Sequence, residues 1–198
     1  WFANSITNKD IADMWIHESF TNYSESLFVE YYYGKEAGFE YVRGTRKGID
    51  NDKPIIGHYD VNSEGSSDMY PKGGNMLHTL RQIVNNDEKW REILRGLNST
   101  FYHQTVTTKQ IEDYLSNATG VNLTAFFNQY LRDTRIPTLE YFFKKGFINF
   151  RWTNCVSGFD MPVKVTLNGA EQVLAPKTEW KNIATKTENQ KLDVNRNF

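Results

Sequence analysis

The chain has 198 residues, with 23 Lys and Arg against 24 Asp and Glu, so its formal net charge is −1. This balance argues against a nucleic-acid-binding protein, which usually carries a basic excess. An aromatic content of 15% argues against intrinsic disorder. No apolar run reaches the roughly 18 residues that a transmembrane helix needs. The single cysteine, Cys155, excludes an intrachain disulfide and leaves the cellular compartment open.

The first two thirds of the sequence predict helices. Apolar residues recur with a period close to 3.6 from Asp10 to Tyr33, and Gly34 is a typical residue at a helix end. The segment 49–68 is rich in Asn, Asp, Pro, Gly and Ser and predicts a long loop. Further helices are expected over 35–48, 69–86, 87–97, 107–119 and 122–132, of which the fourth opens with the capping-box spacing of Thr107 and Gln110.

The pattern changes at Ile136-Pro137, after which short β-type runs follow. The turn pairs Lys145-Gly146 and Asn168-Gly169 separate neighbouring runs. The runs cover residues 138–143, 147–152, 161–167, 172–174 and 178–183. We therefore predict an α+β protein, with a mainly helical part over 1–137 and a small all-β, sandwich-like domain over 138–198.

Two carboxylates in the first helical segment are candidate metal-site residues. Glu18 lies between the large apolar residues Trp15 and Phe20, where a carboxylate is costly unless it is paired or binds a cation. Glu25 follows two helical turns later, on the same face. Such a pair suits a metal ligand and a residue that supports another ligand. Taken alone, Glu18 equally fits a solvated helix face, and Tyr70 alone fits an amphipathic core position.

Three strings together resemble the zinc aminopeptidases of the gluzincin group, the family that includes aminopeptidase N. They are WFANSIT at residues 1–7, WIHESFT at 15–21 and YPKG at 70–73. The first two also have the separation found in that family. Inside the strings, His17 stands where the family usually has Asn, and Ser19 in place of Gly is a mild change. The resemblance covers most of the chain and implies that residues 1–137 form the C-terminal, helical part of a metallopeptidase catalytic domain.

The resemblance also implies an activity and roles for three residues. The family hydrolyses N-terminal residues from peptides by attack of a Zn²⁺-activated water. By analogy, Glu18 is a zinc ligand, Glu25 hydrogen-bonds a ligand histidine, and Tyr70 donates its hydroxyl to the oxyanion of the tetrahedral intermediate. The family's substrate-recognition segment is not in this sequence, so the substrate-binding residues are unknown.

Two further zinc ligands and the general base of the family come from a His-Glu-x-x-His motif, which should end just before Trp1 and is not in this sequence. The chain also opens without an initiator Met. We therefore expect a fragment of a longer enzyme, inactive and without bound zinc by itself. His17 is poorly placed to replace a missing ligand, because adjacent helix positions point about 100° apart. The expected partners are peptide substrates and, through the cleft that the missing helix would leave open, a second copy of the chain.

Alternatives remain open at this point. Another gluzincin, such as a glycyl aminopeptidase, also pairs a glutamate ligand with a later tyrosine. A non-catalytic pseudo-peptidase or binding module would share the fold without the chemistry. Of the other histidines, His78 is expected to be structural, and His58 in the long loop is a candidate substrate contact.

Overall fold

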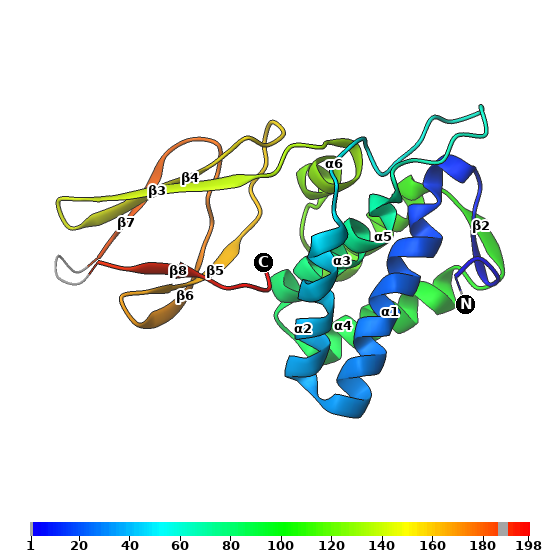
Figure 1. Ribbon diagram of the computed structural model, residues 1–198, viewed down its shortest axis with the longest axis horizontal. Helices are drawn as coiled ribbons and strands as arrows, with labels where there is room; N and C mark the ends of the chain where they lie inside the picture. The colour runs from blue at the N-terminus through cyan, green and yellow to red at the C-terminus, as the bar shows by residue number, and fades with distance from the viewer. Residues whose placement is uncertain (1, 186–189) are drawn as a thin grey trace. The chain divides into compact units, whose positions relative to one another are not determined.

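The computed structural model describes residues 2–185 and 190–198, which form two compact units (Figure 1). The first unit holds the chain up to Thr134 together with Asn197, and the second holds Arg135–Arg196 and Phe198. The first is helical and the second is built from β-strands, so the predicted α+β class is confirmed.

The helical unit contains the helices that the apolar periodicity predicts. They are α1 (Trp15–Tyr33), α2 (Lys35–Thr45), α3 (Pro71–Val84), α4 (Asp87–Thr100), α5 (Thr108–Thr119) and α6 (Thr124–Arg132), with short 3₁₀ helices η1 (Ile11–Asp13), η2 (Arg46–Gly48) and η3 (Ser67–Met69). Gly34 separates α1 from α2 with φ of 93°, a backbone angle that favours glycine. The capping box of α5 is present, with Thr107 and Gln110 satisfying each other's backbone amides.

The core of this unit forms where α1, α3, α4, α5 and α6 turn their apolar faces inward. Each such side chain contributes roughly 1.5–3 kcal/mol when it is fully buried. The largest fully buried side chains include Trp15, Phe20 and Tyr23 of α1, Met76, Leu77 and Leu80 of α3, Trp90 of α4 and Phe127 of α6. Helix α1 is thereby fixed along one side, which determines where Glu18 can point.

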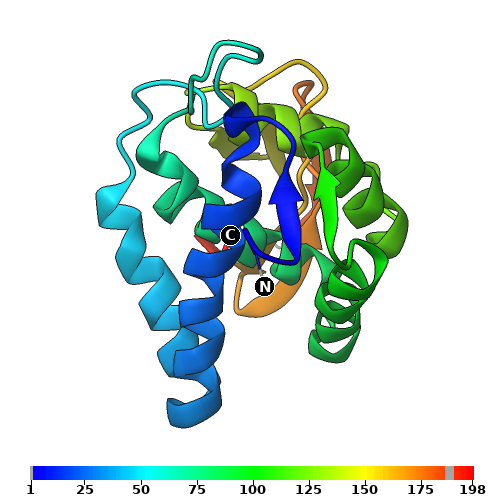
Figure 2. The ribbon, with the colours of Figure 1, turned by 90° about the vertical axis from the view of Figure 1, so that its right-hand side faces the viewer.

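A parallel pair of short strands, β1 (Ile6–Asn8) and β2 (Gln104–Val106), joins the start of the chain to the region before α5 (Figure 2). Close to it, the buried carboxylate of Asp13 accepts hydrogen bonds from Tyr59 Oη at 2.7 Å and from Thr108 N at 3.1 Å. Trp15 Nε1 donates to Thr108 Oγ1 at 2.7 Å. These bonds hold the start of α1, the start of α5 and the long loop together.

The β unit consists of two antiparallel sheets. One has the order β3 (Thr138–Lys144), β4 (Phe147–Thr153), β7 (Lys181–Ala184), and the other β6 (Ala170–Leu174), β5 (Val163–Leu167), β8 (Leu192–Val194). Alternate residues of β4 and β5 are buried, as expected for strands with one face in a core. Lys145-Gly146 and Asn168-Gly169 have positive φ and form the predicted hairpin turns. Within the described residues, no helix is long and apolar enough to cross a membrane.

Candidate functional site

Tyr70 occupies the joint between η3 and α3. Ser66 caps η3 by accepting a hydrogen bond from Asp68 N, and Pro71 is the first residue of α3. Proline suits that position because its missing N–H would have no partner there. Helix η3 therefore ends just before Tyr70, and α3 starts just after it. The Tyr70 side chain is 44% exposed, so its hydroxyl is accessible from solvent.

Glu18 lies in the first turn of α1, half-buried, and the structure brings it together with Tyr70. The pKa of the Tyr70 phenol is raised, first by partial burial and then by the nearby charge of Glu18. The charge of Glu64 acts in the same direction. Helix α1 and the joint before α3 thus bring a carboxylate close enough to a phenol to affect its pKa, although the two residues are far apart in sequence.

Buried polar contacts hold the Tyr70 joint from behind. The carboxylate of Asp68 accepts hydrogen bonds from Asp50 N at 2.9 Å and Asn51 N at 2.8 Å, which fixes the end of the long loop. Lys72 is buried and donates from Nζ to the carbonyl of Asp133 at 2.9 Å. Burial lowers the pKa of Lys72, while the charges of nearby aspartates oppose that shift. Lys72 therefore ties the start of α3 to the end of α6 and does not point into the site.

Ser19 forms a second attachment, directly between the two site helices. Its buried hydroxyl donates to the carbonyl of Met69 at 2.7 Å. Gly73 makes this approach possible, since a Cβ at Gly73 would overlap Ser19 Oγ and lie 2.7 Å from Ser19 Cβ. The sequence shows a serine beside Glu18 and a glycine pair after Lys72. Neither signal reveals that they meet.

Glu25 lies two turns beyond Glu18 on α1 and is exposed. Its carboxylate accepts a hydrogen bond from Tyr41 Oη at 2.7 Å, and this bond is the main reason why the pKa of Tyr41 is raised. The carboxylate is therefore accessible on the surface of α1. The role of supporting a ligand histidine stays a prediction.

The histidines occupy separate places. His17 is buried, and its Nε2 accepts a hydrogen bond from Asn8 N at 2.9 Å. Burial lowers the pKa of His17, so the ring is a neutral partner of strand β1. His58 is exposed in the long loop. His78 is fully buried between the rings of Phe39 and Tyr23, with centroids 4.7 Å and 6.2 Å away.

A zinc ion in a hydrolytic site needs three protein ligands and one open position. Over residues 2–185 and 190–198, no group of three or more His, Cys, Asp and Glu side chains is arranged to hold a metal. Glu18 has the donor chemistry of one ligand, and His17 uses its Nε2 elsewhere. The described residues therefore do not complete a zinc site.

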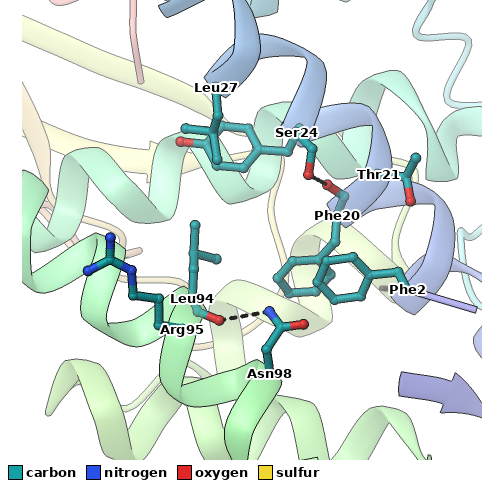
Figure 3. Close-up of a pocket in the computed structure, with 9 residues that line it drawn as sticks. Phe2, Phe20, Thr21, Ser24, Leu27, Leu94, Arg95 and Asn98 are labelled. Carbon is teal, nitrogen blue, oxygen red and sulfur yellow. Dashed lines mark hydrogen bonds between the residues drawn. The ribbon is translucent and has the colours of Figure 1, made fainter. Parts of the chain in front are cut away.

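An apolar groove lies between α1 and α4, with Phe2 adding to its lining (Figure 3). Its volume is about 680 Å³. Phe2 and Phe20 stack at its floor with centroids 4.7 Å apart, while Leu27 and Leu94 line its walls. Arg95 stands at the edge, and none of the described residues forms an ion pair with it. Glu18 and Tyr70 do not line this groove, so it is distinct from the candidate site.

Known proteins are similar to this chain in sequence and in fold. Residues 1–130 match the Peptidase family M1 domain. The chain is 25% identical over 153 residues to aminopeptidase N of Lactococcus lactis subsp. lactis, covering 71% of this chain and 18% of that protein. It is 26% identical over 162 residues to aminopeptidase N of Lactobacillus helveticus, covering 72% of this chain and 18% of that protein. The chain thus spans less than a fifth of the length of these relatives.

A solved structure agrees with these matches at the level of the fold. The crystal structure of Legionella pneumophila aminopeptidase A in complex with aspartic acid superposes with a TM-score of 0.70. The superposition covers 95% of this chain and 23% of that one, at 14% sequence identity. Because the family domain matches the first 130 of 198 residues, the chain belongs to peptidase family M1.

Proposed function

We propose that a protein containing this chain is a zinc-dependent aminopeptidase, in which Glu18 is a zinc ligand and Tyr70 stabilises the transition state. The single observation that carries this proposal is the proximity of Glu18 and Tyr70: their sequence neighbours Ser19 and Met69 are hydrogen-bonded at 2.7 Å, and the charge of Glu18 raises the pKa of the Tyr70 phenol. Membership of the M1 family supplies the reaction class. Aminopeptidase N is the name of the sequence relatives, and peptides are accordingly the proposed substrates.

The phenol of Tyr70 suits the proposed role because it is a neutral donor. An ordinary tyrosine has a pKa near 10, and the surroundings of Tyr70 raise the pKa of its phenol further. The hydroxyl therefore stays protonated throughout the neutral and mildly alkaline range. A donor held in advance where negative charge develops lowers the barrier without needing to reorganise. The hydrogen bonds that hold the joint around Tyr70 support this role, because they fix the backbone that carries the phenol.

When bound, zinc would supply a Lewis acid that polarises the substrate carbonyl and activates water. Glu18 would hold the ion from α1, with the other ligands and the general base coming from a His-Glu-x-x-His motif outside these 198 residues. Glu25, exposed two turns further along, would orient one of those histidines by accepting a hydrogen bond from its ring. Its accessible carboxylate, which accepts a hydrogen bond from the exposed Tyr41, supports this assignment.

The first test uses the chain as it stands. We expect the purified 198-residue chain to retain far less than one zinc per molecule after dialysis and to leave aminoacyl-p-nitroanilides uncleaved, because one carboxylate cannot hold the ion that a hydrolytic site needs. Metal analysis by mass spectrometry measures the first quantity. A longer version that includes an upstream His-Glu-x-x-His should show both properties, and Glu18→Ala in it should remove both. Stoichiometric zinc in the short chain that Glu18→Ala abolishes would contradict the proposal.

The apolar groove between α1 and α4 leads to a second expectation for the short chain. Apolar grooves on the surface are candidate contact surfaces between proteins, so we expect concentration-dependent self-association in sedimentation velocity. Leu94→Glu, which places a charge on the wall of the groove, should shift the chain toward the monomer. Val61→Glu is the matched control, because Val61 is 65% exposed in the long loop and outside the groove. Equal sedimentation of the two variants would show that the groove is not the contact surface.

A further inference from the structure

Ser19 lies where α1 meets the joint that carries Tyr70. It follows Glu18 in sequence, and the carbonyl to which it donates belongs to Met69, which precedes Tyr70. One hydrogen bond of 2.7 Å, from a side chain to a backbone carbonyl, therefore connects the residue after Glu18 to the residue before Tyr70. Ser19 is fully buried, so water does not compete for this bond.

The same contact controls how closely the two helices approach. Gly73 lies against Ser19 without space for a Cβ, and Gly74 lies in the same way against Asn22 Oδ1. With no side chain on α3 at these points, α1 and α3 are separated by little more than the Ser19 hydroxymethyl group. The hydroxyl group thus acts both as a spacer and as a bond between the helices.

We infer that Ser19 is a positioning residue, whose hydrogen bond to the Met69 carbonyl sets the separation between the Glu18 carboxylate and the Tyr70 hydroxyl. The inference rests on the proposed function in so far as those two groups act together in catalysis. The geometry itself is independent of activity. Misplacement of a reacting group by about 1 Å can cost about 10²-fold in rate, so a contact with this task has a functional consequence beyond its share of stability.

Helix α1 offers a matched control in Ser26. Its buried hydroxyl donates to the carbonyl of Gly38 in α2 at 2.9 Å, which is the same kind of bond on the same helix. Gly38 also has no room for a Cβ. Ser26 therefore reproduces the burial and the bond of Ser19 at another close approach between helices, but it links α1 to a helix that carries no proposed site residue.

The experiment measures Tyr70 directly in the 198-residue chain. The chain is labelled with [¹³Cζ]tyrosine, the Tyr70 signal is assigned with Tyr70→Phe, and its chemical shift is recorded at pH 7 for wild type, Glu18→Gln, Ser19→Ala and Ser26→Ala. Each alanine variant loses one buried hydrogen bond, so both should melt about 2–4 °C lower. Of the two alanine variants, only Ser19→Ala should change the chemical shift of Tyr70, and the change should have the same direction as in Glu18→Gln.

An unchanged Tyr70 signal in Ser19→Ala, alongside equal losses of melting temperature, would overturn the inference and leave Ser19 as a packing residue. A Tyr70 signal indifferent to Glu18→Gln would also overturn it, since there would be no separation to set. If Ser19→Ala does not fold, Ser19→Gly removes the same hydroxyl and relieves the close contact with Gly73. The same change in the Tyr70 chemical shift is then expected.

A second measurement separates this inference from the proposed function. In a longer, active protein, Ser19→Ala should lower kcat by up to about 10²-fold with little change in KM, whereas Ser26→Ala should leave both nearly unchanged. If Tyr70→Phe proves active while Ser19→Ala still moves the Tyr70 signal, the proposed catalytic role fails and the positioning contact stands.

Discussion

Tyr70→Phe in a longer, active protein should lower kcat by about 10²–10³-fold, or roughly 3–4 kcal/mol. The substitution removes the hydroxyl that faces Glu18 and keeps the ring. The proposed bond forms to charge that develops only in the transition state, so KM should change little. Steady-state kinetics on an aminoacyl-p-nitroanilide measures both constants.

Two further variants give this experiment its controls. Glu18→Ala should lose zinc together with activity, whereas Tyr70→Phe should keep its full zinc content, because Tyr70 is not a proposed ligand. Tyr33→Phe removes a hydroxyl from a tyrosine that is 76% exposed at the end of α1 and should leave the kinetics unchanged. A Tyr70→Phe enzyme with near-normal kcat would show that Tyr70 has only a structural role.

The helices were predictable because their signals are local. Apolar residues at helical spacing, the glycine at position 34 and the capping box at Thr107 each act within a few residues, and the structure has helices where they occur. At the Tyr70 joint the local signal was incomplete. The apolar pattern suggests a helix from Met69, but α3 begins at Pro71 after a separate 3₁₀ turn. The Ser66 cap and the missing N–H of Pro71 explain this division.

The strands show where local signals end. Hairpin turns at Lys145-Gly146 and Asn168-Gly169 follow from the residues themselves, because both need positive φ. Strands β1, β2 and β8 are three residues long, too short for an alternating pattern to be recognised. Strands β1 and β2 also pair although most of the sequence of the helical unit lies between them. Their pairing depends on the tertiary packing and not on either segment alone.

The candidate site divides in the same way. Glu18, Glu25 and Tyr70 could be selected only because three strings together resemble a known family, since each residue alone fits a commoner structural role. The groups that hold them could not be selected at all. Ser19 meets Met69, and Lys72 meets Asp133, through contacts between helices that no spacing along the chain encodes. Lys72 in particular follows Tyr70 closely in sequence but points away from the site.

Lowering the pH from 7 to 5 should destabilise the helical unit, and we expect His78 to account for about 2 kcal/mol of that loss. Burial lowers the pKa of His78 to about 4, a hydrogen bond with Asn197 opposes this shift, and the charges of Arg81, Arg46 and Arg43 add to it. In the unfolded chain a histidine titrates near 6.5. Between these two values the unfolded state binds the extra proton, so stability is fully present above about pH 6.5 and falls as the pH approaches 4.

Other titratable groups can be distinguished from His78 by the pH range over which they lose their contribution to stability. Asp87, whose pKa is lowered to about 2 chiefly by its hydrogen bond with Arg81, loses its contribution only below the ordinary aspartate value. His17 also has a pKa lowered by burial and loses its contribution to stability over the same pH range as His78.

Urea unfolding of the 198-residue chain at pH 7 and pH 5 measures the loss of unfolding free energy. We expect a large loss for wild type and a much smaller loss for His78→Gln. His58→Gln, which changes an exposed side chain, should show the full wild-type loss. The decisive quantity is the difference between the two pH values within each variant, because His78→Gln also alters packing against Phe39 and Tyr23 at every pH. A His78→Gln chain that keeps the wild-type difference would assign the acid sensitivity to other groups.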